Sequence, residues 1–566
     1  MLQSRSRVRP GPPLWPLLLG VAASVAAPWP LLAAEPPGGQ PVPQAAPLVS
    51  LDWHGELRSR LDYLDGVRWT TSDPSVAAHL DVRHGETSAI PGNGALGNGD
   101  LRLRLEPALH VAEWAEIRSQ IDGVGNLTLG GQSRAGLDTQ NPANQGLNQS
   151  GQTVSLAAMN NQGQLLQQWT SPTGGAAAVS RIGVRRAWVH VRVLGMGEVD
   201  IGRMGDHFGL GMVRNDGRDA FADFQSDLDR IALSAELFGF RLRLARDILF
   251  DGPLNTTALT GGNVLTRGSN ATLTQGRAYP LQDSAEASRW LLQGENVRPA
   301  EALGLRWAAA VMYQSQDNAF FAEHGDCAAQ QSCDLLLPRL VRQFTPQFYL
   351  DWRGRLGGAP LRLQLEGVFR YGTVQRADER LGTDTAKSLV GGGFASRGEW
   401  RRGRSAWQFD LGMASGDRMG GFGVNDQDNW RYAAAADAAP RSLVTGYSFH
   451  RGFLVDNLLF RDIIGAVANA WYFKPSLKRY LFETAPDQGL SVQAGVMTAF
   501  AASDNATPGK ASFLGVEPHA ALGWNTGVLT AVTRATYLMP GAALDAPSGA
   551  RAQPVWRLEA ALRMGF

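Results

Sequence analysis

The sequence lacks three features that would assign it to a familiar class of protein. Only 2 of its 566 residues are cysteines, which excludes a fold held together by many disulfides. Neither charge predominates, because 53 lysines and arginines stand against 52 aspartates and glutamates, and this balance argues against a nucleic-acid-binding surface. Beyond the N-terminal region, no stretch approaches the roughly 18 consecutive apolar residues of a membrane helix.

The N-terminus has the pattern of a secretory signal peptide. Arg5, Arg7 and Arg9 precede a short apolar segment at 17–27, and the small residues Ala33 and Ala34 follow it. We predict a signal peptide over residues 1–34, with cleavage near Ala34 and with Ala27 as the alternative. A membrane anchor is the competing interpretation, which the prolines just after the apolar segment disfavour.

The remaining composition fits two kinds of exported protein. Residues 35–49 are rich in proline and are predicted to be a periplasmic lead-in. The hydrophobic fraction of 44% and the mean hydropathy of −0.18 are values of a water-soluble protein. They also suit a transmembrane β-barrel, because lipid-facing and lumen-facing residues alternate and their hydropathies cancel.

The last eleven residues favour the barrel. In Trp556–Phe566 every second residue is apolar or small, and Arg557, Glu559 and Arg563 occupy the other positions. Because side chains alternate between the two faces of a strand, one face is apolar and the other is charged. The length matches the roughly 9–11 residues of a membrane-crossing strand. The terminal Phe566 resembles the aromatic signal that the barrel assembly machinery recognises in outer-membrane barrels.

The same alternation recurs along the chain, in the segments 51–63, 101–109, 117–122, 186–193, 361–371 and 407–413. Short turns at 112–115, 195–198, 238–239, 354–359, 401–404 and 525–527 alternate with long polar segments such as 64–100, 126–180, 207–228, 249–283 and 314–341. Short periplasmic turns and longer outer loops are the asymmetry of outer-membrane barrels. We predict one all-β domain over 50–566, an antiparallel transmembrane barrel of about 18 strands, within 16–20, with both termini in the periplasm.

One region does not fit the alternation. In 447–489, the segment 453–464 has apolar residues at helical spacing, and both a short helix folded into the lumen and an ordinary strand remain open. We expect one long loop to fold inward as a constriction, with 207–228 and 447–464 as the first candidates.

Several motifs resemble porin-like outer-membrane proteins, and more narrowly a poorly characterised family of large barrels from Gram-negative bacteria. The motifs are Arg185-Arg-Ala-Trp188, Gly202-Arg-Met204 with His207-Phe-Gly-Leu-Gly211, Ala414-Ser-Gly-Asp417, and Val455-Asp456 with Leu459-Phe-Arg461 and Asn469-Ala470. The resemblance covers about residues 50–566. It implies a passive channel in the outer membrane and names no solute.

Charged residues at inward-facing strand positions are the predicted pore-lining residues. The basic ones are Arg58, Arg60, Arg102, Arg104, Arg118, Arg186, Arg192, Arg241, Arg243, Arg362, Arg370, Arg557 and Arg563, and the acidic ones are Glu56, Glu106, Glu116, Asp122, Glu366 and Glu559. Charges on a pore wall set its ion preference, and the excess of arginine predicts a mild preference for anions. The competing interpretation is that these residues pair across strands and only stiffen the wall.

Two further sites are suggested by loops. Asp216, Asp219, Asp223, Asp227 and Asp229 offer clustered oxygen ligands and form a weak calcium candidate, although a polar loop has the same composition. Cys327 and Cys333 lie in one predicted outer loop of an exported chain, so we expect them to form a disulfide.

Catalytic motifs are missing from the sequence. It contains no G-x-S-x-G, no H-E-x-x-H and no P-loop, so we predict no enzyme and no cofactor. The predicted function is passive diffusion of small hydrophilic solutes through an outer-membrane porin. The alternatives are a non-conducting barrel whose loops bind a ligand or partner, and a barrel that hydrolyses lipid or peptide. The expected partners are outer-membrane lipid and the assembly machinery, and the residues argue neither for nor against a homotrimer.

Overall fold

The computed structural model describes residues 49–70, 79–83, 96–111, 113–128, 169–170, 183–193, 197–219, 221–251, 286–296, 304–323, 333–374, 386–417 and 443–566. Contacts divide the chain into Met1–Pro47 and Leu48–Phe566, and all described residues belong to the second unit. The predicted signal peptide (1–34) and lead-in (35–49) therefore lie outside the described residues, except for Val49, where the first strand begins.

Long antiparallel strands make up nearly all of the described chain. They are β1 (Val49–Asp65), β4 (Leu96–Val111), β5 (Ala115–Thr128), β7 (Gly183–Val193), β8 (Gly197–Gly205), β9 (Gln225–Leu237), β10 (Phe240–Asp251), β11 (Glu286–Asn296), β12 (Leu305–Glu323), β13 (Cys333–Leu356), β14 (Ala359–Val374), β15 (Lys387–Arg402), β16 (Ser405–Ala414), β18 (Ala470–Ala485), β19 (Gln488–Ala501), β20 (Phe513–Asn525), β21 (Leu529–Pro540) and β22 (Val555–Gly565). Two-residue strands, β6 (Trp169–Thr170) and β17 (Leu443–Val444), join the same sheet, and β2 (Val67–Thr70) pairs with β3 (His79–Val82) in a separate hairpin.

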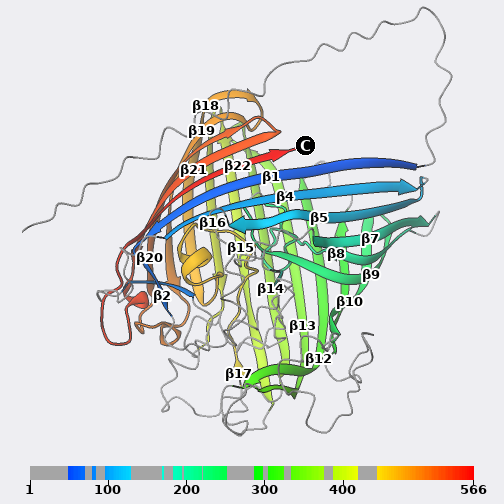
Figure 1. Cartoon of the computed structure of the whole chain (residues 1–566), viewed down its shortest axis with the longest axis horizontal. Coiled ribbons are helices and arrows are strands. Elements are labelled where there is room, and N and C mark those ends of the chain that lie inside the picture. Colours follow the sequence, from blue (N-terminus) through cyan, green and yellow to red (C-terminus); the bar gives the residue numbers. More distant parts are fainter. Residues whose placement is uncertain are drawn as a thin grey trace, which may run out of the picture. The chain divides into compact units, whose positions relative to one another are not determined.

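The long strands form a closed ring. Each pairs with the long strands before and after it in the chain, and β1 pairs with β22, so the described residues form a closed antiparallel barrel of 18 long strands (Figure 1). Closure leaves no open edge along the paired length, so the backbone groups there bond to one another. The predicted fold class and strand number are confirmed, as is the fold implied by the resemblance to porin-like outer-membrane proteins.

The seam between β1 and β22 shows which face each residue takes. The two strands pair residue by residue, from Glu56 opposite Gly565 at one end to Asp65 opposite Trp556 at the other. Leu558, Leu562, Met564 and Phe566 are exposed on the outer surface, whereas Arg557 and Glu559 are buried inside. The predicted orientation of the last strand is confirmed by this exposure pattern.

The connections differ between the two ends of the barrel. At one end, consecutive strands are only a few residues apart, at 112–114, 194–196, 238–239, 357–358, 403–404 and 526–528, which are the places of predicted turns. A further turn at 486–487 joins β18 to β19 and was not predicted. At the other end, the predicted loop 314–341 is wrong, because β12 continues to Glu323 and β13 begins at Cys333.

Of the two alternatives left open for residues 453–464, the helical one is confirmed for a single turn, and the strand alternative is wrong. Residues 459–463 form a single π-helical turn, η7 (Leu459–Ile463), within the connection from β17 to β18. From Ala470 onward the chain is ordinary strand. Within the described residues, no helix has the length and apolar character required to cross a membrane.

Gly55 is a point at which closure depends on the lack of a side chain. A Cβ at this position would lie 2.6 Å from ring carbons of Phe566 and 2.8 Å from the backbone oxygen of Arg104. The ring can rotate away, but the backbone oxygen belongs to the neighbouring strand. We therefore expect Gly55→Val to destabilise the closed barrel by about 1–3 kcal/mol, measured as a lower midpoint of heat or denaturant unfolding on semi-native gels.

Gly97 provides the matched control for this variant. It lies in β4, the strand beside β1, and a Cβ there would meet no atom within 4 Å. Equal stability of Gly55→Val and Gly97→Val would contradict the packing argument.

Candidate functional site

Two connections at the end of the barrel opposite the short turns fold back against the inner wall. We name them the first inner loop, residues 206–224 between β8 and β9, and the second inner loop, residues 445–469 between β17 and β18. They contain the two segments expected to narrow the lumen, and both of them do contact inward-facing wall residues, as described below.

The first inner loop is fixed to strands on opposite sides of the ring. The backbone N–H groups of Leu210 and Met212 donate to one oxygen of Glu366 on β14, at 2.6 and 3.2 Å. Farther along the loop, the carbonyl oxygen of Ala222 accepts from Arg58 of β1 and Arg102 of β4. Because β14 and β1 lie nearly opposite each other in the ring order, the loop crosses the lumen.

The second inner loop is held by a glutamate in the same manner. Glu517 on β20 accepts from the backbone N–H groups of Asn457 and Leu459, one on each carboxylate oxygen, at 2.9 and 3.0 Å. Two backbone N–H bonds to one side chain hold the loop at two nearby positions. Each inner loop is thus bound to the wall by one inward-facing glutamate.

Apolar packing adds to the attachment of the second inner loop. Phe449, Leu458, Leu459 and Phe460 are fully buried in a cluster that lies inside the barrel. The wall facing them carries small residues, among them Ala395, Ala414, Ala470 and Ala499. At Gly393 a Cβ would lie 2.7 Å from the ring of Phe449. Part of the interior is therefore an apolar core rather than the fully polar surface that was predicted.

The two inner loops also bond to each other. His450 of the second loop donates its backbone N–H to the carbonyl of Met212, at 2.8 Å. Its ring Nδ1 accepts from the backbone N–H of Gly452, so Nε2 carries the proton and donates to the hydroxyl of Ser226 at the start of β9. The two loops therefore form one connected structure across the lumen.

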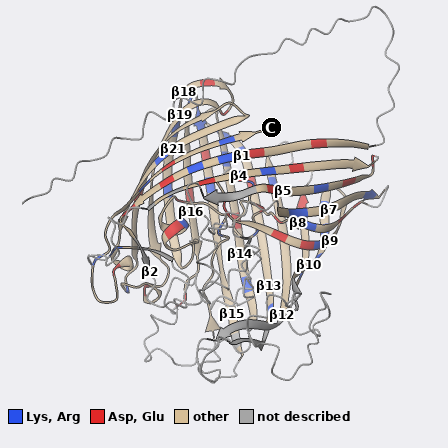
Figure 2. Ribbon diagram, viewed as in Figure 1, with Lys and Arg blue, Asp and Glu red and all other residues tan. Residues whose placement is uncertain are grey.

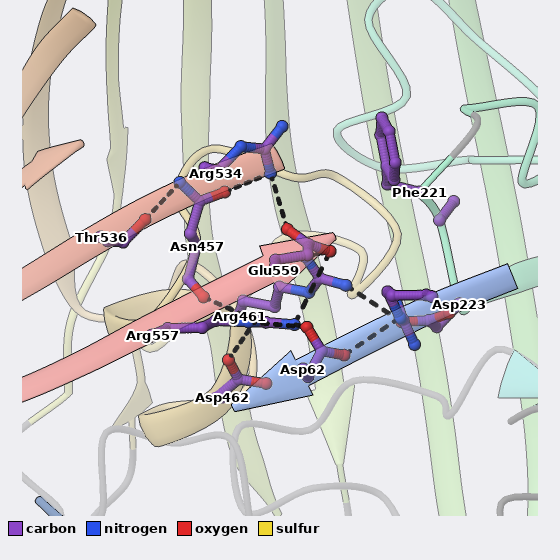
Figure 3. Close-up of polar contacts among 12 residues, drawn as sticks. Asp62, Phe221, Asp223, Asn457, Arg461, Asp462, Arg534, Thr536, Arg557 and Glu559 are labelled. Carbon is purple, nitrogen blue, oxygen red and sulfur yellow. Dashed lines mark hydrogen bonds and ion pairs between the residues drawn. The ribbon is translucent and has the colours of Figure 1, made fainter. Parts of the chain in front are cut away.

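Charged residues join this structure to the seam of the barrel. Asp223 of the first loop bonds three arginines: Arg58 and Arg60 of β1, at 3.0 and 2.8 Å, and Arg461 of the second loop, at 3.3 Å. Arg461 extends onward to Glu559 of β22 (Figure 3). Burial raises the pKa of Asp223, but the attraction of Arg60, Arg461 and Arg58 outweighs it and holds the pKa well below its usual range. Asp223 is therefore ionised at all physiological pH values.

A second cluster holds the start of the first inner loop. Asp206 bonds Arg214 of the same loop, Arg230 of β9 and Arg289 of β11, at 3.0, 3.1 and 2.6 Å. Burial raises the pKa of Asp206, but the three arginines outweigh burial and lower the pKa well below its usual range. Buried charges persist only when paired, so these bonds fix where the loop leaves the wall.

The predicted pore-lining residues fall into two groups. Those covered by the inner loops or by their own partners are buried: Glu56, Arg58, Arg60, Arg102, Arg104, Asp122, Arg186, Glu366, Arg370, Arg557 and Glu559. Those nearer the short-turn end are partly or fully exposed: Glu106, Glu116, Arg118, Arg192, Arg241, Arg243, Arg362 and Arg563. Residues of both charges follow one another along β1, β4 and β5 (Figure 2).

The calcium candidate is not supported by the arrangement of its residues. Asp216 bonds His207 and Arg218, Asp227 bonds Arg186, and Asp229 bonds Arg203, so these carboxylates have separate basic partners. Asp223 is taken by the arginines described above, and Asp219 accepts the backbone N–H of Phe221. Within the described residues, no group of three or more histidines, cysteines, aspartates and glutamates is placed to hold a metal ion. The disulfide between Cys327 and Cys333 stays a prediction, because Cys327 lies outside the described residues.

Sequence reasoning missed several residues of this site. Glu517 occupies an inward position of β20 and could have been found by strand parity. Asp206 and Arg214 lie in irregular chain and Arg461 lies in the single turn η7, where no periodic pattern marks them. Their roles arise from loop conformations that bring them to strands distant in sequence.

No protein-family model matches the chain, and no curated protein matches it. Similar solved structures include OccK11 (OpdR) of Pseudomonas aeruginosa, 11% identical, with a TM-score of 0.44 over 91% of this chain and 96% of that chain. OccK2 (OpdF) of the same organism, in complex with glucuronate, is 12% identical, with a TM-score of 0.43 over 91% and 97%. OmpT, an outer membrane protein of Vibrio cholerae, is 8% identical, with a TM-score of 0.32 over 92% and 99%. At such low values, function has to be argued from this chain's own residues.

Asp223 is the residue on which the inner loops most depend electrostatically. Asp223→Asn removes the carboxylate that Arg58, Arg60 and Arg461 share and leaves them their partners Asp100 and Glu559, so we expect the loop attachment to lose about 1.5–3 kcal/mol of stability. Hydrogen exchange at residues 221–224 and 458–462 should become faster. Asp219→Asn is the control, because Asp219 is exposed in the same loop and the amide oxygen of asparagine can still accept the N–H of Phe221, so exchange should stay unchanged.

His450 makes the joint between the loops sensitive to acid. Burial lowers the pKa of His450 from 6.5 to about 3, so the ring is neutral in the closed arrangement. When the loops separate, the ring regains its ordinary pKa and takes up a proton below pH 6.5. The separated state then binds more protons, so the joint weakens as pH falls from 6.5 toward 3 and does not change above 6.5. Exchange protection of the His450 and Ser226 amides, corrected for intrinsic rates, should fall over that range, and His450→Gln should remove the pH dependence.

Proposed function

We propose that the chain forms a channel in the outer membrane of a Gram-negative bacterium, through which small hydrophilic solutes diffuse passively. The observation that carries this proposal is the closed barrel of 18 long strands, apolar outside and charged inside, among the described residues. A barrel of 16–18 strands is wide enough to leave an aqueous channel. No energy source or cofactor is needed for such transport.

The outer surface supports insertion in a membrane. Exposed aromatic residues lie near the short-turn ends of strands, as at Trp307, Trp407 and Trp524, and near the opposite ends, as at Tyr63 and Trp471. Aromatic girdles at both interfaces flank the apolar band of transmembrane barrels. Because β1 begins and β22 ends at the short-turn end, both strand ends would lie in the periplasm. The outer surface would contact outer-membrane lipid, and Phe566 would be recognised by the assembly machinery.

A mild preference for anions is supported by the way ion pairs are oriented on the wall. Arg353 and Arg362 share Asp351, and the side chains are 58% and 40% exposed, whereas that of Asp351 is 3% exposed. The pairs Arg397–Asp410 and Arg563–Glu56 have the same asymmetry. In each pair the guanidinium faces the lumen and the carboxylate lies behind it. A permeating ion would therefore meet mainly positive charge.

Among the alternatives to a channel, the inner loops favour a non-conducting barrel that binds a ligand or partner. Arg58 and Arg370 are fully buried beneath them, and the loops are joined to each other across the lumen. A barrel filled in this way could instead be non-conducting and bind a ligand or partner at its outer end. The channel is the preferred function because arginines at inward-facing positions near the short-turn end, such as Arg192 and Arg362, keep exposed side chains.

Conductance in a planar bilayer tests the channel. The purified protein should give stable, ohmic single-channel steps, and a salt gradient should give a reversal potential of anion-preferring sign. Arg362→Glu should shift that potential toward cation preference, because it places a negative charge on the lumen wall beside Asp351. Arg479→Glu is the matched control, since Arg479 is exposed at an outward-facing position of β18 and should leave selectivity unaltered. Silence at all voltages would reject the channel and leave the binding barrel.

A further inference from the structure

The barrel wall has a step where the ring closes. β1 pairs with β22 from Asp65 to Glu56, and Gly55 exchanges backbone hydrogen bonds with Phe566. The preceding residues, Val49–His54, pair with β4 alone among the described residues. The neighbouring turn at 526–528 ends at the same level, because Gly565 donates to the carbonyl of Val528. Figure 1 shows β1 and β4 continuing well beyond the C-terminal end of β22.

The free edge of this segment presents backbone groups at alternate residues. Gly55 donates to and accepts from Phe566, so in an antiparallel ladder the odd-numbered residues of β1 point toward β22. Trp53, Leu51 and Val49 therefore aim their N–H and C=O groups at the open side. The position of Pro107 agrees with this assignment, because it lies opposite Trp53 and has no N–H to donate.

Among the described residues, the edge has no proline, lysine, bulge or covering segment, and its inward-pointing charge is Asp52. Natural edges are blunted by proline, lysine, bulges or a covering segment. Val49-Ser-Leu-Asp-Trp-His54 contains neither proline nor lysine, and its register with β4 has no bulge. Its apolar residues stand out from the outer surface, with Val49, Leu51 and Trp53 exposed by 56%, 47% and 56%. An added strand would cover these side chains and satisfy the free backbone groups.

The inner side of the same edge is acidic. Asp52 bonds only the imidazole of His110, and Glu106 accepts only from Gln120, so within the described residues neither carboxylate pairs with an arginine or lysine. His54, opposite Glu106, is exposed. A strand added here would place alternate side chains beside Asp52, where basic residues are favoured.

Two other occupants of the edge are disfavoured by geometry and sequence. A second copy inserted in the same orientation would be related to the first by an axis along the membrane normal. Because the strands tilt by about 40°, the two edge strands would then cross at roughly 80° and could not run side by side. The chain's own residues 35–47 contain prolines at 36, 37, 41, 43 and 47, which cannot donate to a ladder.

We propose that Val49–His54 is a docking strand, to which an extended segment of a periplasmic protein adds by β-augmentation. The segment alternates apolar residues, which pack on Leu51 and Trp53, with basic residues, which face Asp52. Main-chain bonds give such complexes their affinity and the alternate side chains give their specificity. The placement in the periplasm rests on the proposed membrane insertion, whereas the binding itself does not.

The test uses the full chain in detergent and a soluble peptide that alternates valine with lysine. The peptide should bind, and a peptide with glutamate in place of lysine should bind more weakly. On binding, hydrogen exchange should slow at the amides of Leu51 and Trp53. The amides of Ser50 and Asp52, already bonded to β4, should not change. Absence of binding, or protection at even-numbered residues instead, would overturn the proposal.

Variants separate edge pairing from non-specific adhesion. Leu51→Pro removes one free-edge N–H without touching the ladder to β4, and should weaken binding about tenfold. Leu51→Val keeps the N–H and should bind nearly as well as the parent. Asp52→Lys should reverse the preference between the two peptides. Equal binding by Leu51→Pro and Leu51→Val would reject the docking strand.

Conductance of the same preparations keeps the two proposals distinguishable. A conducting protein that does not bind the peptide rejects the docking strand and leaves the channel intact. A silent protein that binds the peptide with the predicted exchange pattern supports the docking strand and rejects the channel.

Discussion

Closure of the backbone ladder between β1 and β22 is the constraint on which the rest of the structure depends. A sheet in contact with lipid cannot leave N–H and C=O groups unpaired, so it must close, and closure divides every strand into an outer and an inner face. The outer face then selects apolar residues such as Leu558 and Phe566. The inner face is free to carry charge, but it encloses a lumen that is wide for its side chains to fill.

The inner loops follow from that width. Arginines such as Arg58 and Arg289 each have an acidic partner on an adjacent wall strand, Asp100 and Asp247, and their burial favours further partners. Asp223 and Asp206 supply the partners from the first inner loop, while Glu366 and Glu517 reach from the wall to bind loop backbone. Wall and loops thus neutralise and bond each other. This reciprocity explains why the loop conformations and the wall charges cannot be understood separately.

The sequence predicted what depends on strand periodicity and little of what depends on loop conformation. Parity alone placed Arg557 inside and Leu558 outside, and short turns gave the strand number, because a strand's side-chain direction is set locally. The convergence of Arg60, Asp223 and Arg461 joins residues from three distant parts of the chain, so no local pattern contains it. The apolar interior around Phe449 was missed for a related reason. Its partners are alanines and glycines, whose small size indicates a packed neighbour only when that neighbour is known.

The proposed preference for anions rests on side-chain length more than on composition. The chain's net charge of +1 implies no preference between anions and cations. Aspartate is short and remains near the backbone, whereas arginine is long and extends over it toward the lumen. In pairs such as Arg362–Asp351 and Arg397–Asp410, the more exposed end is therefore the positive one, although the pair itself is neutral. Pairing across strands, which alone would suggest a merely stiffened wall, is thus compatible with a selective one.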